Sequence, residues 1–195
     1  MLCVVYVDDG IIAGKTQELV EAAFTKLRNA FEIRDMGEST DFRGIQIVRD
    51  RAARTLIIHQ ANNTAELVSR YHIGKTHLIP MCPRTKLIVE GPIMDRPERY
   101  PMLTGELQHL VDCTRPDLAK PVSALASFTK KPTNAHWDAA LQVLSYVGGT
   151  ANEGITYGTT DAQLVGYTDS DYAGMPGSRS TSGVVFMLFG GAISW

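Results

Sequence analysis

The chain has 195 residues and a mass of 21.4 kDa, which suits one domain of ordinary size or two small ones. Hydrophobic residues make up 44%, charged residues make up 21%, and the formal net charge is −2. This composition excludes an intrinsically disordered chain and a polybasic protein. The cysteines Cys3, Cys82 and Cys113 form no disulfide framework, which favours a reducing compartment. The longest uncharged hydrophobic run, residues 183–193, is too short to span a bilayer, so we expect a soluble, intracellular chain.

The first half of the chain is predicted to open with a β-hairpin. Hydrophobic runs at residues 2–7 and 11–13 flank the turn signal Asp8-Asp9-Gly10, which indicates a buried hairpin with two carboxylates at its tip. Thr16 can cap a following helix that extends to Phe31, because hydrophobic residues recur there at steps of three and four. The pattern then predicts strands at 44–48 and 55–59 around a basic turn at 49–54, a helix at 61–71, and a long proline-rich connection at 72–101.

The second half is predicted to be helical and then rich in strands. Helices are expected at 102–113, 117–129 and 135–147, and Gly148-Gly149 is a natural stop for the last one. Strands are expected at 154–157, 163–168, 183–189 and 192–195. Because the first and last strands lack polar flanking segments, we expect a reading frame that was once longer in both directions. The order of elements, first rich in strands, then helical, then rich in strands, predicts two partial α/β units joined by a helical segment, and we expect an α+β fold for the chain.

The sequence Tyr6-Val-Asp-Asp9 is the sharpest chemical feature of the chain. Two neighbouring carboxylates repel each other unless cations lie beside them. Divalent metal ions held at such a turn suit phosphoryl transfer, because they stabilise both the attacking and the leaving oxygens. The alternative interpretation is an ordinary Asp-Asp-Gly hairpin turn, and the residues alone leave the two interpretations about even.

Nine short motifs, in one order along the whole chain, carry a resemblance to a known family. They are residues 6–9 (YVDD), 31–37 (FEIRDMG), 42–47 (FRGIQI), 113–117 (CTRPD), 132–137 (PTNAHW), 143–150 (VLSYVGGT), 166–174 (GYTDSDYAG), 179–183 (RSTSG) and 190–195 (GGAISW). Each motif alone is weak, but nine in the right order are very specific. The chain resembles the reverse transcriptase–RNase H region of copia-type retrotransposon polyproteins.

This resemblance implies roles for five residues. Asp8 and Asp9 match the metal-binding aspartates of the polymerase palm. Tyr6 and Val7 match positions that lie near the primer end and the incoming nucleotide. Asp169 matches the first-strand aspartate of the RNase H metal site, and the nearby Asp171 is a weaker candidate. Without the resemblance, Asp169 and Asp171 would be interpreted as a solvated strand end.

The resemblance also implies an architecture and partners. It places a partial palm and the following connection in residues 1–95, a helical thumb or connection in 96–150, and the first strands of an RNase H-like domain in 151–195. The parent protein would use Mg²⁺ or Mn²⁺, an RNA template, RNA–DNA hybrid and deoxynucleotides, together with the rest of the polyprotein and no membrane. Its expected location is the cytoplasm, in a virus-like particle, with the nucleus as the alternative.

The chain departs from the family pattern at several points. The family has a third palm aspartate upstream of YVDD and further RNase H acids downstream of the Ile-Ser-Trp segment, so we expect both sites to be incomplete. Arg43 stands where the family usually has an apolar residue, and Asn63 and His109 stand at common tyrosine positions. An alternative is therefore a decayed or repurposed, non-catalytic chain that binds nucleic acid or protein. A stand-alone metal hydrolase built on Asp169 and Asp171 lacks sufficient carboxylates.

Two other groups of residues carry side chains that could bind a metal ion or a phosphate. His72, His77 and Cys82 lack zinc-type spacing, so they do not predict a metal site. The arginines of the basic turn at 49–54, with Lys130 and Lys131, could contact phosphates, although a solvated turn and a helix end are the simpler interpretation.

Overall fold

The chain forms two compact units in a computed structural model that describes residues 1–82, 85, 87, 91–158, 162–175 and 179–195. The first unit is Met1–Arg43 and the second is Gly44–Trp195. The first contains β1 (Leu2–Tyr6), β2 (Asp9–Ala13), α1 (Gln17–Ala30) and β3 (Asp41–Phe42). The second contains β4 (Ile45–Asp50), β5 (Thr55–His59), α2 (Ala61–Arg70), α3 (Arg99–Cys113), a 3₁₀ turn η1 (Pro116–Leu118), α4 (Ala119–Ala126), α5 (Asn134–Gly149), β6 (Gly154–Tyr157), β7 (Val165–Met175), β8 (Arg179–Leu188) and β9 (Gly191–Ser194). Mixed α and β structure is thus confirmed.

The first unit is a hairpin followed by a helix. Strands β1 and β2 pair antiparallel, and α1 packs against β2. As predicted, Thr16 caps α1, with its hydroxyl accepting a hydrogen bond from the Leu19 N–H at 3.4 Å. The prediction of a buried hairpin is wrong for this chain, because Leu2 is 64% exposed and Val5 69% exposed. Within the unit α1 covers little of the hairpin, so most of the hydrophobic strand residues face solvent.

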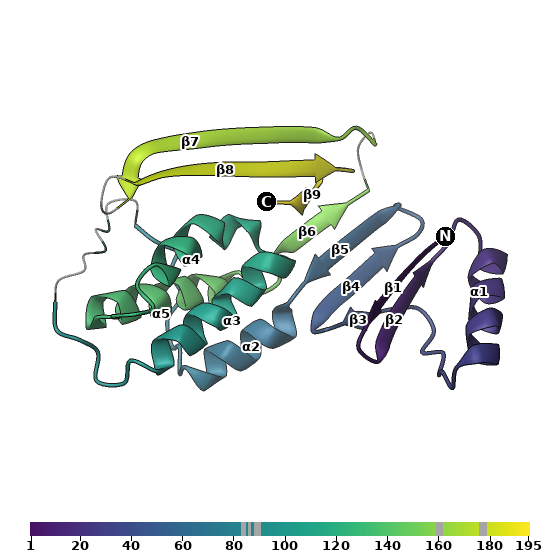
Figure 1. Cartoon of the computed structure of the whole chain (residues 1–195), viewed down its shortest axis with the longest axis horizontal. Coiled ribbons are helices and arrows are strands. Elements are labelled where there is room, and N and C mark those ends of the chain that lie inside the picture. Colours follow the sequence, from purple (N-terminus) through teal and green to yellow (C-terminus); the bar gives the residue numbers. More distant parts are fainter. Residues whose placement is uncertain (83–84, 86, 88–90, 159–161, 176–178) are drawn as a thin grey trace. The chain divides into compact units, whose positions relative to one another are not determined.

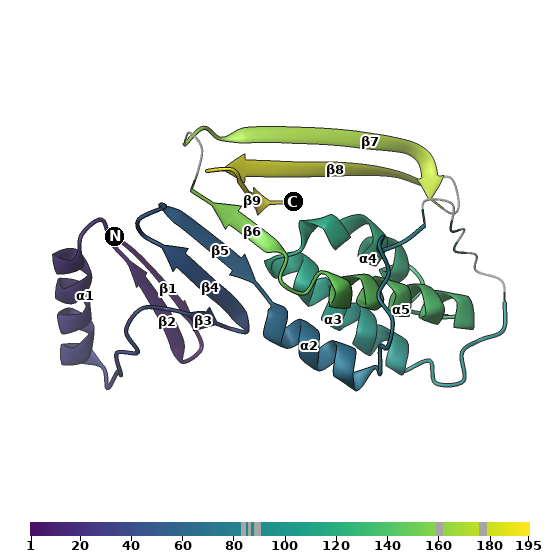
Figure 2. The same cartoon turned by 180° about the vertical axis from the view of Figure 1, so that it is seen from behind.

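The core of the second unit lies among its helices. Figures 1 and 2 show α2, α3, α4 and α5 packed together, with β6 leading from α5 back to β5. The fully buried side chains include Tyr100, Leu103, Leu107, Leu110, Leu118, Val122, Leu125, Val143, Leu144 and Val147. Their repeated spacing of three and four residues along α3 and α5 explains why these segments form helices with one buried face. Among helices in the described part of the chain, none has the length and hydrophobicity needed to cross a bilayer.

The strands of the second unit form antiparallel sheets. Strand β5 lies between β4 and β6, with Ile58 opposite Ile47 on one side and Ile155 on the other. Strands β7 and β8 form a long ribbon, and β9 pairs with the end of β8 (Figure 1). The last strand is tied to the helices through Trp195, whose indole N–H donates to the Val111 carbonyl at 3.0 Å. Segments from all three predicted parts (1–95, 96–150 and 151–195) therefore share the second unit, while the predicted boundaries themselves stay predictions.

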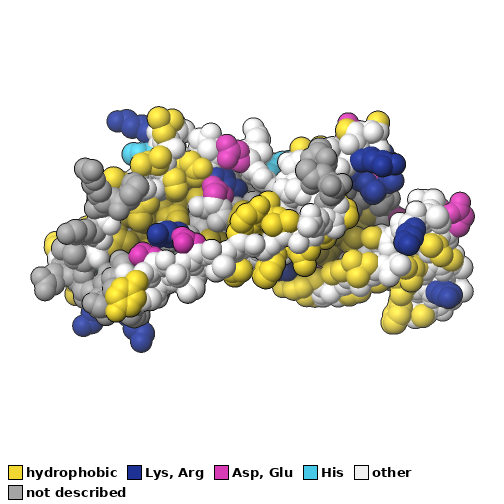
Figure 3. Space-filling view, turned by 90° about the horizontal axis from the view of Figure 1, so that it is seen from above, with side chains coloured by type: hydrophobic (Ala, Val, Ile, Leu, Met, Phe, Trp, Pro, Cys, Tyr) yellow, Lys and Arg dark blue, Asp and Glu magenta, His cyan; other side chains and the backbone are white. Residues whose placement is uncertain are grey.

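Large hydrophobic side chains remain exposed along the ribbon. They include Leu164, Tyr167, Tyr172, Val184, Phe186, Phe189 and Ile193. In the space-filling view, hydrophobic side chains occupy much of the visible surface (Figure 3). Exposed apolar surface of this extent is unusual for a monomer, and it is typical of surfaces that other protein segments cover.

Tyr100 offers a simple test of the helical core. Its ring is fully buried, and its hydroxyl donates to the Leu125 carbonyl at 2.8 Å, linking α3 to α4. Burial raises the pKa of Tyr100 well above its ordinary value. We expect Tyr100→Phe to lower the free energy of unfolding by about 1–2 kcal/mol, because a buried carbonyl loses its partner. Urea unfolding measures this. The control is Tyr146→Phe. The Tyr146 hydroxyl is exposed and donates to Asp117 at 3.3 Å, so its loss should lower the free energy of unfolding less. Equal effects of the two substitutions would contradict the expectation.

Candidate active site

The acidic hairpin places its two aspartates differently from the sequence expectation. Tyr6 and Asp9 are directly opposite each other, so Val7 and Asp8 form a two-residue loop and Asp9 already belongs to β2. The predicted turn Asp8-Asp9-Gly10 is therefore wrong by one position. Two-residue loops match the twist of the strands on either side, and this geometry sets the tip one residue earlier. Asp8 lies at the tip itself, and Asp9 begins the return strand.

Val7 adopts a backbone conformation that is rare for its residue type. Its φ is 54°, in the left-handed region that a β-branched side chain disfavours. A type II′ hairpin turn prefers glycine at this first loop position. The cost of such a residue is of the order of 1–3 kcal/mol, and strain of this kind clusters at functional sites. The hairpin therefore keeps a strained, 83% exposed valine immediately beside Asp8.

The hairpin fits a divalent metal ion only in part. Asp8 and Asp9 are both exposed and supply carboxylate oxygens, which Mg²⁺ prefers as ligands. Mg²⁺ commonly takes one or two carboxylates from a protein and completes its shell with water and substrate phosphates. Within the described ranges, no group of three or more His, Cys, Asp or Glu side chains comes close enough together to hold a metal ion. Two carboxylates are what this chain itself contributes at the hairpin.

Asp169 and Asp171 lie on β7 in the second unit. They are opposite Gly183 and Thr181 of β8, both are exposed, and their spacing of two puts them on one face of the ribbon. The space beside Gly183 is open, since a Cβ built there would meet no other atom within 4 Å. The Asp169 side of the ribbon can therefore admit a ligand. Asp8 and Asp9 belong to the first unit and Asp169 to the second.

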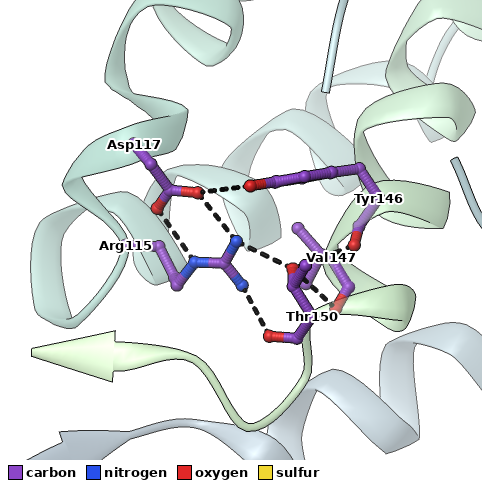
Figure 4. Close-up of polar contacts among 5 residues, drawn as sticks. All are labelled: Arg115, Asp117, Tyr146, Val147 and Thr150. Atoms are coloured by element: carbon purple, nitrogen blue, oxygen red, sulfur yellow. Dashed lines mark hydrogen bonds and ion pairs between the residues drawn. The ribbon is translucent and has the colours of Figure 1, made fainter. Parts of the chain in front are cut away.

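A buried network around Arg115 was missed by the sequence reasoning (Figure 4). The Arg115 side chain is 4% exposed, and its Nε and Nη2 donate to the two carboxylate oxygens of Asp117 at 2.9 and 2.8 Å. The guanidinium also donates to the Thr150 carbonyl at 3.1 Å and to its hydroxyl at 2.9 Å. Burial, the largest single influence, lowers the pKa of Arg115, but the hydrogen bond to Asp117, the Asp117 charge and smaller contributions from Tyr146 and Glu153 together outweigh it, so the pKa is raised.

This network joins two of the nine motifs. Arg115 and Asp117 belong to residues 113–117, and Tyr146 and Thr150 belong to residues 143–150. The Tyr146 hydroxyl donates to Asp117 at 3.3 Å, and the Thr150 hydroxyl donates to the Tyr146 carbonyl at 2.9 Å. The network therefore fixes the C-terminal end of α5 against η1. The signal in the sequence was an arginine followed two residues later by an aspartate. The contact between Arg115 and Thr150 could not be predicted without the fold.

A second polar cluster lines a shallow groove between α2 and α3. Arg70 forms ion pairs with Glu66 and Glu106, and the Tyr71 hydroxyl donates to Glu106 at 2.8 Å. Burial and this hydrogen bond raise the pKa of Tyr71 to about 12. Asn63 and His109, two departures from the family pattern, line the same groove. Because its charged groups already pair with one another, the groove is less suited to a polar ligand than the acidic hairpin.

Comparison with known proteins identifies relatives over the whole chain. The chain is 31% identical to the retrovirus-related Pol polyprotein from transposon TNT 1-94 of Nicotiana tabacum, over 100% of this chain and 15% of that protein. It is 34% identical to the corresponding polyprotein from transposon RE1 of Arabidopsis thaliana, over 98% of this chain and 13% of that protein. It is also 28% identical to an uncharacterised mitochondrial protein of Arabidopsis thaliana, over 100% of this chain and 82% of that protein.

The chain thus spans about 15% or less of the two polyproteins that it matches. No family model matches the chain. No solved structure matches it either. The whole-chain identity to transposon polyproteins nevertheless agrees with the order of the nine motifs. The chain therefore belongs to the copia-type, retrovirus-related Pol polyproteins of transposons.

Proposed function

We propose that this chain is part of the reverse transcriptase–RNase H region of such a Pol polyprotein, in which Asp8 and Asp9 hold divalent metal ions for nucleotidyl transfer. The observation that supports this most strongly is the position of Asp8 in a two-residue hairpin loop, between the strained Val7 and Asp9, the first residue of β2. The fold that we propose for this part is a partial palm, followed by a helical connection and the first strands of an RNase H-like domain.

The residues of the hairpin would have separate roles. Asp8 and Asp9 would hold Mg²⁺ or Mn²⁺, and bound metal ions would supply stabilisation of the negative charge that develops as a primer 3′-hydroxyl attacks a nucleotide α-phosphate. Tyr6 and Val7 would contact the primer end and the incoming deoxynucleotide. The tight loop holds these four groups in a fixed order, so substrate and carboxylates meet with little loss of entropy. The third aspartate of the family would come from another part of the polyprotein.

We propose a second role for Asp169. It would be the first-strand metal ligand of the RNase H site, where the RNA strand of a hybrid is hydrolysed. Its exposure on β7 and the open space beside Gly183 support a ligand there. In the parent protein the substrates would be an RNA template and RNA–DNA hybrid, the partner would be the rest of the polyprotein, and the location would be the cytoplasm.

A segment exchange tests the polymerase assignment. The matching segment of a family Pol polyprotein that extends primers in the chosen assay is replaced by these 195 residues, and extension of oligo(dT) on poly(rA) is measured with Mg²⁺. We expect the chimaeric protein to extend the primer and Asp8→Asn to reduce the rate by more than about a hundredfold, because a metal ligand is lost. Asp35→Asn, which changes another exposed acid of the same unit, should leave the rate within a few-fold. Undiminished extension by the Asp8→Asn protein would contradict the proposal.

A second candidate function is a non-catalytic, element-derived chain. The similarity to a mitochondrial protein of which the chain covers 82% favours it, because that relative is far shorter than a Pol polyprotein. The same exchange separates the two candidates. A soluble chimaeric protein that binds the primer–template but never extends it, whatever residue stands at position 8, would support the non-catalytic candidate.

A further inference from the structure

Arg43 lies against the tyrosine of the acidic hairpin. Both residues belong to the first unit, and the Arg43 Cζ is 3.4 Å from the centre of the Tyr6 ring. At this distance an end-on approach would drive a guanidinium nitrogen into the ring, so the guanidinium must lie flat on the ring face. Stacking of this kind occupies the face of the guanidinium and leaves its N–H groups, which lie in its plane, available as donors.

The backbone holds this arginine in place. Arg43 has a φ of 54° and Gly44 a φ of 77°, which are consecutive left-handed residues of the kind that a type I′ turn requires. Arginine is an uncommon residue at such a position, where asparagine, aspartate and glycine are preferred. The conformation is costly for a long side chain, and it directs Arg43 from a tight turn rather than from a flexible segment.

Stacking on Tyr6 places the positive charge on the hairpin that carries the two carboxylates. Tyr6 and Asp9 are directly opposite each other across the hairpin, and opposite side chains share a face with Cβ atoms about 4.5–5.5 Å apart. The Tyr6 ring that Arg43 covers is therefore the cross-strand neighbour of Asp9. The ion pair that the structure shows within the first unit joins Arg28 to Asp35. Two adjacent carboxylates repel an approaching phosphate, and a neighbouring cation offsets that repulsion.

We propose that Arg43 binds a phosphate group at the acidic hairpin, with Tyr6 as the platform that positions its guanidinium. This inference rests on the proposed function of the hairpin and adds a residue to it. The phosphate belongs either to the backbone of a nucleic-acid strand or to a nucleoside triphosphate. The family usually has an apolar residue at this position, so the contact is a feature of this chain rather than of the family pattern.

Binding experiments on the 195-residue chain test the proposal without any catalysis. One probe is a fluorescein-labelled RNA–DNA hybrid and the other a fluorescent deoxynucleoside triphosphate, each measured by anisotropy from about 20 to 200 mM salt, where phosphate contacts dominate the salt dependence. The variants are Arg43→Gln, which removes the charge, and Arg43→Lys, which keeps it. Arg34→Gln is the matched control, because it removes an exposed arginine of the same unit.

We expect Arg43→Gln to weaken binding of one probe by about tenfold at low salt and to lower the slope of log K against log[salt] by about one. Arg43→Lys should keep the slope, and Arg34→Gln should match the unchanged chain. Loss on the hybrid assigns a strand phosphate, and loss on the triphosphate assigns the nucleotide. All three substitutions preserve the same turn, and thermal unfolding confirms that each variant is folded.

Two results would overturn the proposal. One is binding of both probes by Arg43→Gln with unchanged affinity and salt slope. The other is no binding of either probe by the unchanged chain at the lowest salt. Neither result bears on whether primer extension depends on Asp8, so failure of this inference is distinguishable from failure of the proposed function.

Discussion

Asp117→Ala is expected to lower the free energy of unfolding of the second unit by about 3 kcal/mol, because it leaves a buried charge without its partner. The Arg115 side chain is almost completely enclosed, and Asp117 accepts two of its hydrogen bonds. Thr150 supplies neutral acceptors but no negative charge. Urea unfolding followed by circular dichroism measures the effect.

The size of the effect depends on which partner is removed. Asp117→Asn keeps an acceptor and should cost less than Asp117→Ala. Arg115→Met should also cost less than Asp117→Ala, because the aspartate left behind is 41% exposed and remains hydrated. Asp138→Ala, on the exposed side of α5, is the matched control and should stay within about 0.5 kcal/mol. If Asp117→Ala lowered the free energy of unfolding no more than this control, the network would not contribute to the stability of the second unit.

Asp169→Asn is expected to reduce hydrolysis of the RNA strand by more than about a hundredfold in the chimaeric Pol protein, since a metal ligand is lost. The assay is release of labelled RNA from an RNA–DNA hybrid. Asp171→Asn should have a smaller effect, because Asp171 is two residues further along β7, opposite Thr181 rather than Gly183. Equal hydrolysis by the Asp169→Asn and unchanged proteins would contradict the assignment of this residue.

The regular elements with strong periodic patterns were predicted well from the sequence. β5 and β6 have the bounds 55–59 and 154–157 that the pattern indicated, and α2 ends one residue earlier than expected. Hydrophobic alternation and helical spacing are local signals, and these short elements follow them. The predicted helix at 117–129 is instead a 3₁₀ turn followed by α4, which ends at Ala126. The segment starts in the tighter 3₁₀ turn at Pro116.

The ribbon of β7 and β8 shows where local signals fail. The sequence predicted strands at 163–168 and 183–189, whereas β7 continues to Met175 and β8 begins at Arg179. The added part of β7 includes Asp169, Ser170 and Asp171, which lack hydrophobic alternation. These residues are extended because they pair with β8, so the extension depends on a partner strand that composition does not indicate.

The candidate site, like the fold, was predicted from the sequence only in part. Resemblance to the family named Asp8, Asp9 and Asp169 and assigned them to different parts of the chain, but the division into units at Arg43 and Gly44 comes from the fold. The hairpin was wrongly predicted to be buried. Its hydrophobic residues indicate that burial against another segment is favourable, but they do not indicate that this chain supplies that segment. The contact between Arg43 and Tyr6 joins residues 37 positions apart in the sequence through a turn that arginine rarely occupies. No pattern in the sequence predicts such a contact.

We propose that this chain contributes ligands to two separate metal sites, and one crossed measurement tests that proposal most directly. Asp8→Asn and Asp169→Asn are introduced separately into the chimaeric Pol protein, and primer extension and RNA-strand hydrolysis are both measured for each. We expect Asp8→Asn to reduce extension by more than about a hundredfold and to keep hydrolysis within a few-fold, and we expect Asp169→Asn to do the reverse. Loss of both activities in both variants, or of neither, would contradict it.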